Sequence, residues 1–280
     1  SSFNGGMRKA LLSLLLLAAT CMAAPRKVWR RRLVSGAVSM TATLTLPGIV
    51  SQRDHIMRSD PLKPYTLSKT AWCAVRLVDP VLCASLVQRH TVARNCRQPS
   101  ARSFLLVGMA AVSGVRHAVW GAVVLRKPWP LSLSLLVSAG NNLINWLHCR
   151  ASLEREDEAI ERLGPVAMLG VAAFVVGSYL ESVSELQRLA FKAEPNNKDR
   201  LCTCGLWRHA AHINYLGYVL WRTGIGMVSA PPYSVAYGLA HLLDFRFRAI
   251  PLLRRHMRAR YGKAWDEYAA TTAVLVPRLL

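Results

Sequence analysis

Residues 165–183, with the sequence PVAMLGVAAFVVGSYLESV, decide the fold class, because no charged side chain appears in them before Glu181. A helix needs about 20 predominantly apolar residues to cross a bilayer. A charge placed at membrane depth costs several kcal/mol, so an uncharged stretch of this length is typical of a segment surrounded by lipid. The stretch is therefore predicted to be a transmembrane helix.

Further apolar stretches lie on both sides of this helix, and charge is concentrated between them. They cover residues 71–89, 104–125, 131–147, 214–230 and 233–245. Asn142 and Asn145 lie within the third stretch, and such amides are expected to face other helices rather than lipid. The last two stretches are short for a complete crossing and flank Pro231 and Pro232, which predicts a helical hairpin that enters the membrane and returns. The expected fold is all-α, a polytopic transmembrane helix bundle of about 5–7 spans with this C-terminal hairpin and a cytosolic tail helix.

The chain is strongly basic, with a formal charge of +21 from 36 Lys and Arg against 15 Asp and Glu. Basic proteins often bind nucleic acid, but the sequence has no motif of a nucleic-acid-binding module. Many of the basic residues fall in 185–212 and 246–280, which the predicted hairpin places on one side of the membrane. By the positive-inside rule that side is cytosolic, or stromal in a plastid, and it suits an anionic cofactor. We therefore expect a membrane, and no nucleic acid, as a partner.

The N-terminal residues 1–60 have the composition of a targeting segment. Met7, Arg8 and Lys9 precede an apolar run, an Arg-rich and hydroxyl-rich stretch follows, and no acidic residue occurs before Asp54. A signal peptide followed by a plastid transit peptide fits this order, and so does a first membrane anchor with a basic flank. The remaining residues, 61–280, are predicted to form the membrane domain, with 181–280 as its cofactor-binding half. We expect an integral protein of the endoplasmic reticulum or a plastid membrane.

The cysteine pattern argues against a metal site and against a disulfide framework. The chain has seven cysteines, an odd number, and the pair Cys202 and Cys204 fits no zinc-binding spacing. Free thiols and no bound metal are therefore expected.

Two segments concentrate basic, aromatic and polar residues at helical spacing. The first is 205–217, GLWRHAAHINYLG, and the second is 258–268, RARYGKAWDEY, in which Arg258, Tyr261, Trp265 and Tyr268 form one helical stripe. Arginine and lysine neutralise phosphates, and aromatic rings stack on adenine, so the pattern suits a dinucleotide or an adenosyl ligand. A belt of Trp, Tyr and Arg at the lipid headgroups has the same composition and remains the alternative.

The segment 181–280 resembles the C-terminal half of the steroid 5-alpha-reductase superfamily. The family pattern G-L-W-R-Y-S-R-H-P-N-Y-x-G-E lies over residues 205–218, and E-x-x-x-D-x-Q-K-x-x-F-R lies over 181–192. The family ending Y-G-x-x-W-x-x-Y is similar to residues 261–268. The nearest likeness is to the uncharacterised steroid-reductase-like membrane family, and sterol C14 reductases and isoprenylcysteine carboxyl methyltransferases share the same end.

The resemblance implies an NADPH pocket lined by the residues that match the family pattern, with Arg260 added from its charge and position. The candidate cofactor-binding residues are Arg188, Lys192, Trp207, His212, Asn214, Tyr215, Arg260, Tyr261 and Tyr268. Ala211, Ile213 and Tyr218 depart from the pattern, which has Arg, Pro and Glu there. A missing arginine removes a phosphate or carboxylate contact of about 1.5–3 kcal/mol.

The resulting hypothesis is an integral membrane oxidoreductase that uses NADPH to reduce an enone or alkene of a lipid or steroid-like substrate. The catalytic residue stays unassigned. Tyr179 and Tyr215 are conceivable proton donors, and Glu181 is either an acid or a helix-end carboxylate paired with a basic residue. One alternative is a membrane methyltransferase that uses S-adenosylmethionine, because the methyltransferase branch shares H-x-N-Y-x-G. A non-catalytic membrane protein that retains the fold is the other.

Overall fold

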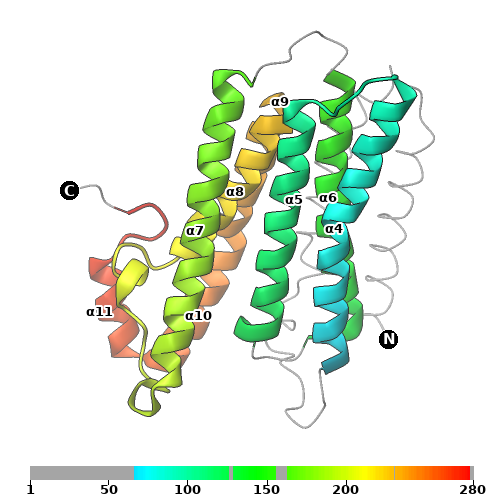
Figure 1. The fold of residues 1–280 in the computed structure, drawn as a ribbon. Helices are drawn as coiled ribbons and strands as arrows, with labels where there is room; N and C mark the ends of the chain where they lie inside the picture. The colour runs from blue at the N-terminus through cyan, green and yellow to red at the C-terminus, as the bar shows by residue number, and fades with distance from the viewer. Residues whose placement is uncertain (1–65, 126–128, 156–162, 230, 278–280) are drawn as a thin grey trace.

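The computed structural model describes residues 66–125, 129–155, 163–229 and 231–277, and it shows a bundle of helices with a smaller helical cap at one end (Figure 1). The bundle comprises α4 (Thr66–Ala93), α5 (Ala101–Val119), α6 (Leu131–Arg155), α7 (Pro165–Ala193), α8 (Ile213–Ser229) and α9 (Pro231–Asp244). The π-helices η1 (Trp120–Val124) and η5 (Phe245–Ala249) continue α5 and α9. The cap is the end of the bundle formed by α10 (Ile250–Tyr261), α11 (Lys263–Thr271), the turn at 205–212, the last three turns of α7 and the first turn of α8. Within the described ranges no strand occurs, which confirms the predicted all-α bundle.

Three of the described helices are long and apolar enough to cross a membrane: α4, α5 together with η1, and α7. They contain the predicted stretches 71–89, 104–125 and 165–183 almost completely. Large apolar side chains such as Val81, Val115 and Leu169 are exposed on the outside of these helices, as lipid-facing positions should be.

The shorter or more polar helices complete the bundle. The amides of α6 face inward as predicted, because Asn142 Nδ2 donates to the Val75 carbonyl of α4 at 2.6 Å. Helices α8 and α9 have 17 and 14 residues and pack against each other, so the expected C-terminal hairpin is present. The predicted targeting region, residues 1–60, lies outside the described residues.

Helices α7 and α8 pack antiparallel at very short range, because glycines face each other at two levels. A Cβ on Gly177 would lie 2.5 Å from the carbonyl oxygen of Gly217, and a Cβ on Gly224 would lie 2.4 Å from that of Gly170. Small residues are the usual means of bringing helix backbones together in lipid, where the hydrophobic effect supplies no net attraction. This contact fixes α8, and with it the segment that precedes it, against the end of α7.

The tail differs from the prediction of one continuous helix over 258–268. Gly262 adopts φ 52°, in the left-handed region that favours glycine, so α10 ends at Tyr261 and α11 begins at Lys263. The predicted stripe is therefore split: Arg258 is exposed, whereas Trp265 and Tyr268 are buried in the cap.

Candidate active site

The turn at 205–212 is anchored to α7 by its first residues. Gly205 has φ +61°, and a Cβ there would come within 2.5 Å of Gln187 Oε1. That oxygen accepts a hydrogen bond from the Leu206 amide at 2.8 Å. Only glycine satisfies both the backbone conformation and the close approach of the glutamine.

Trp207 joins three parts of the cap. Its indole Nε1 donates to the Ser184 carbonyl of α7 at 2.8 Å, and its own carbonyl accepts from Tyr268 Oη at 2.5 Å. Burial raises the pKa of Tyr268, so its phenol stays protonated and remains a donor. Both rings are at least nine-tenths buried. Trp207 and Tyr268 therefore support the site by joining α7, the turn and α11. The indole nitrogen and the phenol hydroxyl are both engaged in these hydrogen bonds, so neither is free for a ligand.

The chain end closes over the turn by backbone hydrogen bonds. The Ala211 amide donates to the Ala273 carbonyl at 2.8 Å, and the His212 amide donates to the Val274 carbonyl at 3.1 Å. The residues that follow α11 therefore lie directly against the turn at 205–212. Ala211 replaces the arginine of the family pattern and is buried against Trp265 and Tyr268, so the missing cation leaves an apolar contact.

Glu185 connects the end of α7 with the start of α8. Its carboxylate accepts from Asn214 Nδ2 at 2.9 Å and forms an ion pair with Arg188, and its side chain is 7% exposed. The Arg188 guanidinium also lies 5.8 Å above the Trp207 ring. Arg188, Asn214 and Trp207, which the resemblance singled out, are therefore neighbours, and Arg188 and Asn214 share the carboxylate of Glu185.

An aromatic stack with an unpartnered imidazole lies on the other side of Asn214. The rings of His212 and Tyr215 are stacked with centroids 5.7 Å apart, and Tyr215 stacks on Phe245 of η5 at 4.4 Å. The buried atoms His212 Nε2 and Arg254 Nε have no hydrogen-bond partner. Burial, and then the charge of Arg254, lowers the pKa of His212 to about 4, so the imidazole is neutral at pH 7.

The remaining candidate cations already have partners within the chain. Lys192 Nζ donates to the carbonyl oxygens of Asn197, Lys198 and Arg200 and lies 5.2 Å from the Tyr261 ring. Arg260 forms an ion pair with Asp199 at 3.6 Å on the surface. The structure thus gathers all nine predicted residues at one end of the bundle, while their role in binding stays a prediction.

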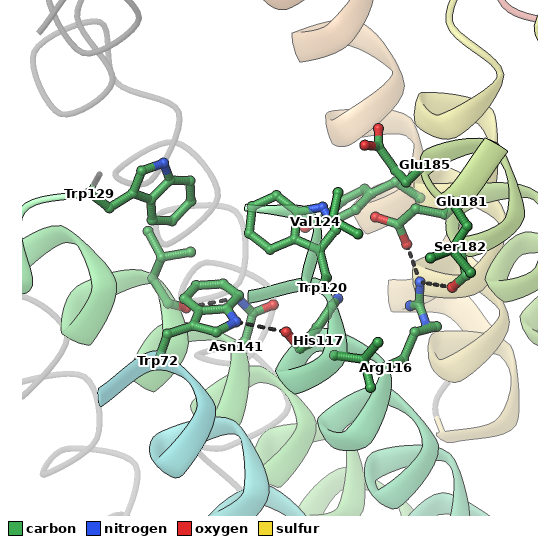
Figure 2. Close-up of a pocket in the computed structure, with 14 residues that line it drawn as sticks. Trp72, Arg116, His117, Trp120, Val124, Trp129, Asn141, Glu181, Ser182 and Glu185 are labelled. Atoms are coloured by element: carbon green, nitrogen blue, oxygen red, sulfur yellow. Dashed lines mark hydrogen bonds and ion pairs between the residues drawn. The ribbon is translucent and has the colours of Figure 1, made fainter. Parts of the chain in front are cut away.

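A cavity of about 340 Å³ opens into the bundle beside this cap (Figure 2). Its walls come from the first halves of α4, α6 and α8, the second half of α7, the end of α5 with η1, and Trp129 before α6. The lining residues are Trp72, Arg116, His117, Val119, Trp120, Val124, Trp129, Val137, Asn141, Glu181, Ser182, Glu185, Leu186 and Tyr218. Glu185 therefore belongs to both the cavity and the cap.

The polar end of the cavity is an ion pair between Arg116 and Glu181, which Figure 2 shows across from Trp120. Glu181 also accepts from Trp221 Nε1 at 2.7 Å. The carboxylate of Glu181 is therefore paired with a base as one interpretation expected, although it lies within α7, which continues to Ala193, and not at a helix end. Its role as an acid stays a prediction. Tyr179 is 58% exposed on the outer face of α7 and does not line the cavity, so it is no proton donor for this site.

Sequence reasoning missed the role of Arg116 and of the two π-helices. Arg116 was only an interruption of an apolar stretch, although an ionisable residue inside a span is by default a functional candidate. The η1 turn carries Trp120 into the cavity wall, and η5 carries Phe245 onto Tyr215. Single π-helical turns are frequent at functional sites, but nothing in the sequence marks them.

An adenosyl cofactor fits the donor set of the cap. The orphaned buried atoms of His212 and Arg254 offer hydrogen bonds to a carboxylate, a hydroxyl or a ring nitrogen, and leaving such atoms unpaired is costly. The aromatic rings beside them already stack on one another, with Tyr215 between His212 and Phe245. Among the described residues no group of three or more His, Cys, Asp and Glu side chains could hold a metal ion, and the six described cysteines are free thiols.

Comparisons with known proteins agree with this architecture. Residues 146–272 match the model of a family described as a protein of unknown function (DUF1295), a domain of the steroid 5-alpha-reductase C-terminal-like superfamily. The chain is also 29% identical over 168 residues to the probable O-methyltransferase ustE of Ustilaginoidea virens. That alignment covers 56% of this chain and 59% of the relative, so the chain spans about three fifths of its length. Each match covers only part of the chain, and the first overlaps the segment whose resemblance to this superfamily was noted from its sequence motifs.

Proposed function

We propose that the protein is a membrane methyltransferase that uses S-adenosylmethionine to methylate an oxygen of a lipid-soluble acceptor. The observation that carries the proposal is the position of Glu185, which lines the apolar cavity and at the same time binds Asn214 and Arg188 of the cap. An acceptor in the cavity and a cofactor in the cap would meet at this carboxylate.

The charge of the cap favours an adenosyl cofactor over a dinucleotide phosphate. S-adenosylmethionine carries a sulfonium and one carboxylate, whereas NADPH brings several phosphate charges that need free cations. Lys192 and Arg260 are already engaged by carbonyls and by Asp199, and Arg188 by Glu185. The relative that is named an O-methyltransferase supports the same choice.

Each residue of the site has a definite task in this mechanism. When bound, S-adenosylmethionine supplies an electrophilic methyl group. His212 and Arg254, with their orphaned nitrogens, would hold polar groups of the cofactor, and the rings of Tyr215 and Phe245 would pack beside it. The cavity excludes water from the acceptor, and Glu185 would accept the proton that an acceptor hydroxyl loses.

The second candidate function is the NADPH-dependent reduction of a lipid or steroid-like substrate. Arg208 and Arg255 favour it, since both are exposed near the cap and make no ion pair in the described part of the chain. Two such guanidinium groups could neutralise phosphates that the engaged cations cannot. A non-catalytic protein that retains the fold is the remaining alternative, and the same experiment separates all three.

The test is ligand binding to the purified full chain in detergent, followed by transfer of a labelled methyl group. We expect S-adenosylmethionine to raise the melting temperature and NADPH to leave it unchanged, and the Asn214→Ala variant to lose the shift. Glu185→Gln should abolish methyl incorporation into a membrane lipid extract, whereas the exposed control Glu194→Gln should not. If only NADPH raises the melting temperature, the result favours the reductase. If neither cofactor raises it, the result favours a non-catalytic protein that retains the fold.

A further inference from the structure

A second polar centre lies deep within the bundle, behind the cavity-lining residue Tyr218. Arg76 and Asp79 of α4 and Arg222 of α8 are at most 1% exposed and lie near the middles of their helices. Charged side chains at membrane depth are rare because they are costly, and they usually mark a functional site. The proposed methyl transfer uses none of these three residues.

The carboxylate of this centre is already neutralised. Asp79 forms an ion pair with Arg76 at 3.0 Å and accepts from Asn145 Nδ2 at 2.6 Å. Arg76 also donates to Asn142 Oδ1 of α6. Arg76 and Asp79 therefore form a paired and hydrogen-bonded unit without net charge.

Arg222 is left without a counter-charge of its own. Its guanidinium lies 4.2 Å above the Trp221 ring, and its Nε donates to Tyr218 Oη at 3.3 Å. Its Nη1 is buried and has no hydrogen-bond partner, and no described carboxylate forms an ion pair with it. Since two guanidinium groups share one carboxylate, the centre as described carries one excess positive charge.

Two further polar atoms without partners face the same region from α9. Tyr237 and His241 pack edge to face with ring centroids 4.6 Å apart, and the ring of His241 lies 5.1 Å from that of Tyr218. Tyr237 Oη and His241 Nε2 are buried and unpartnered, and Tyr237 is only 9% exposed. A hydroxyl, an imidazole nitrogen and a guanidinium nitrogen are thus each buried without a hydrogen-bond partner in the part of the bundle around Tyr218.

We propose that Arg222, Tyr237 and His241 bind one monovalent anion inside the bundle, either a halide or a carboxylate. A water molecule would satisfy the hydrogen bonds but would leave the excess charge in a medium of low dielectric constant, where it is most costly. A divalent anion would replace one excess charge by another of opposite sign. A single negative charge that accepts several hydrogen bonds matches both requirements.

The anion has two possible sources, and the experiment separates them. The full chain is purified in detergent, and its melting temperature is followed against sodium bromide or acetate, with sodium sulfate at equal ionic strength as the reference. We expect a saturable rise of several degrees with the monovalent anions, because a ligand that binds only the native state stabilises it. Native mass spectrometry of the same preparation detects a carboxylate from a co-purified fatty acid.

In the Arg222→Gln variant, bromide and acetate should no longer raise the melting temperature, and no co-purified fatty acid should be detected. The exposed control Lys263→Gln should show the same signals as the wild type. If Arg222→Gln does not fold, Tyr237→Phe keeps the charge and should raise the half-saturating anion concentration several-fold. A co-purified acid without any salt effect identifies the bilayer as the source. A wild-type protein with neither signal, or with the same signals in Arg222→Gln, overturns the proposal and leaves water as the occupant.

Discussion

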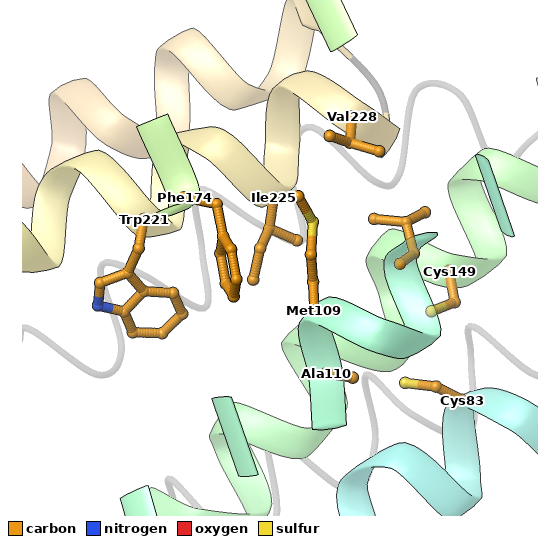
Figure 3. Close-up of a cluster of buried hydrophobic side chains, with 9 residues drawn as sticks. Cys83, Met109, Ala110, Cys149, Phe174, Trp221, Ile225 and Val228 are labelled. Atoms are coloured by element: carbon orange, nitrogen blue, oxygen red, sulfur yellow. The ribbon is translucent and has the colours of Figure 1, made fainter. Parts of the chain in front are cut away.

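Replacing Gly224 by alanine tests whether the close contact of α7 and α8 holds the bundle together. A Cβ at this position would lie 2.4 Å from the Gly170 carbonyl oxygen and 2.6 Å from the Phe174 amide nitrogen, both of which are backbone atoms. Neither atom can rotate away, so the helices must separate. Figure 3 shows that Phe174 lies among the buried side chains of the core, including Trp221 and Met109, so the shift would loosen that packing as well.

The expected loss of stability is about 1–3 kcal/mol, the usual range for overpacking a tight interior. For a chain of this size that corresponds to a melting temperature lower by roughly 2–12 °C. Gly108→Ala is the matched control, because no atom lies within 4 Å of its Cβ position and alanine is the better helix former by up to about 1 kcal/mol.

Thermal unfolding of the three proteins in one detergent, followed by circular dichroism, measures both effects. We expect Gly224→Ala to melt below the wild type and Gly108→Ala to melt at or slightly above it. Equal melting temperatures for the two variants would refute the view that backbone contact between α7 and α8 organises the bundle.

Three other predictions concern the cap and the cavity. Tyr268→Phe removes the donor to the Trp207 carbonyl and should cost about 1–3 kcal/mol, whereas Tyr261→Phe should change stability by less than about 0.5 kcal/mol; chemical denaturation measures both. Because the pKa of His212 falls from 6.5 to about 4 on folding, the unfolded chain binds the extra proton between these values. The free energy of unfolding is therefore highest above pH 6.5 and falls by an amount on the order of 3 kcal/mol as the pH is lowered to 4. Because His212→Gln removes the titrating group, it should flatten the dependence of stability on pH in this range. Arg116→Gln should destabilise by about 1.5–3 kcal/mol, and adding Glu181→Gln should restore part of the loss; additive effects would contradict the ion pair.

The apolar helices were predictable because lipid allows only uncharged stretches to remain in it. Residues 165–183 and the other stretches fall on observed helices, and their ends differ by a few residues to about ten. The break at Gly262 was not predicted, since the spacing of Arg258, Tyr261, Trp265 and Tyr268 is compatible with one helix. The positive φ of a glycine is a property of the packed cap and does not appear in a periodicity.

The candidate site was predictable in its members and only partly in their tasks. Resemblance placed His212, Asn214 and Arg188 in one pocket, and the structure brings them together. It did not distinguish side chains that support the site, such as Trp207 with its hydrogen bonds to α7 and α11, from those with a free polar atom, such as His212. Which atoms already have partners depends on contacts between residues far apart in the chain.

The sequence alone determined that this is an all-α membrane protein with a basic, polar C-terminal end. Charge is costly in lipid, so the helices that cross it are long, mostly uncharged stretches, which can be recognised from the order of residues. Only the tertiary structure decided that Glu185 joins cavity and cap, that Glu181 is paired with Arg116, and that Arg222 lacks a counter-charge. Each of these depends on which side chains of separate helices meet, and electrostatic energy inside a bundle is set by such distances and not by spacing along the chain.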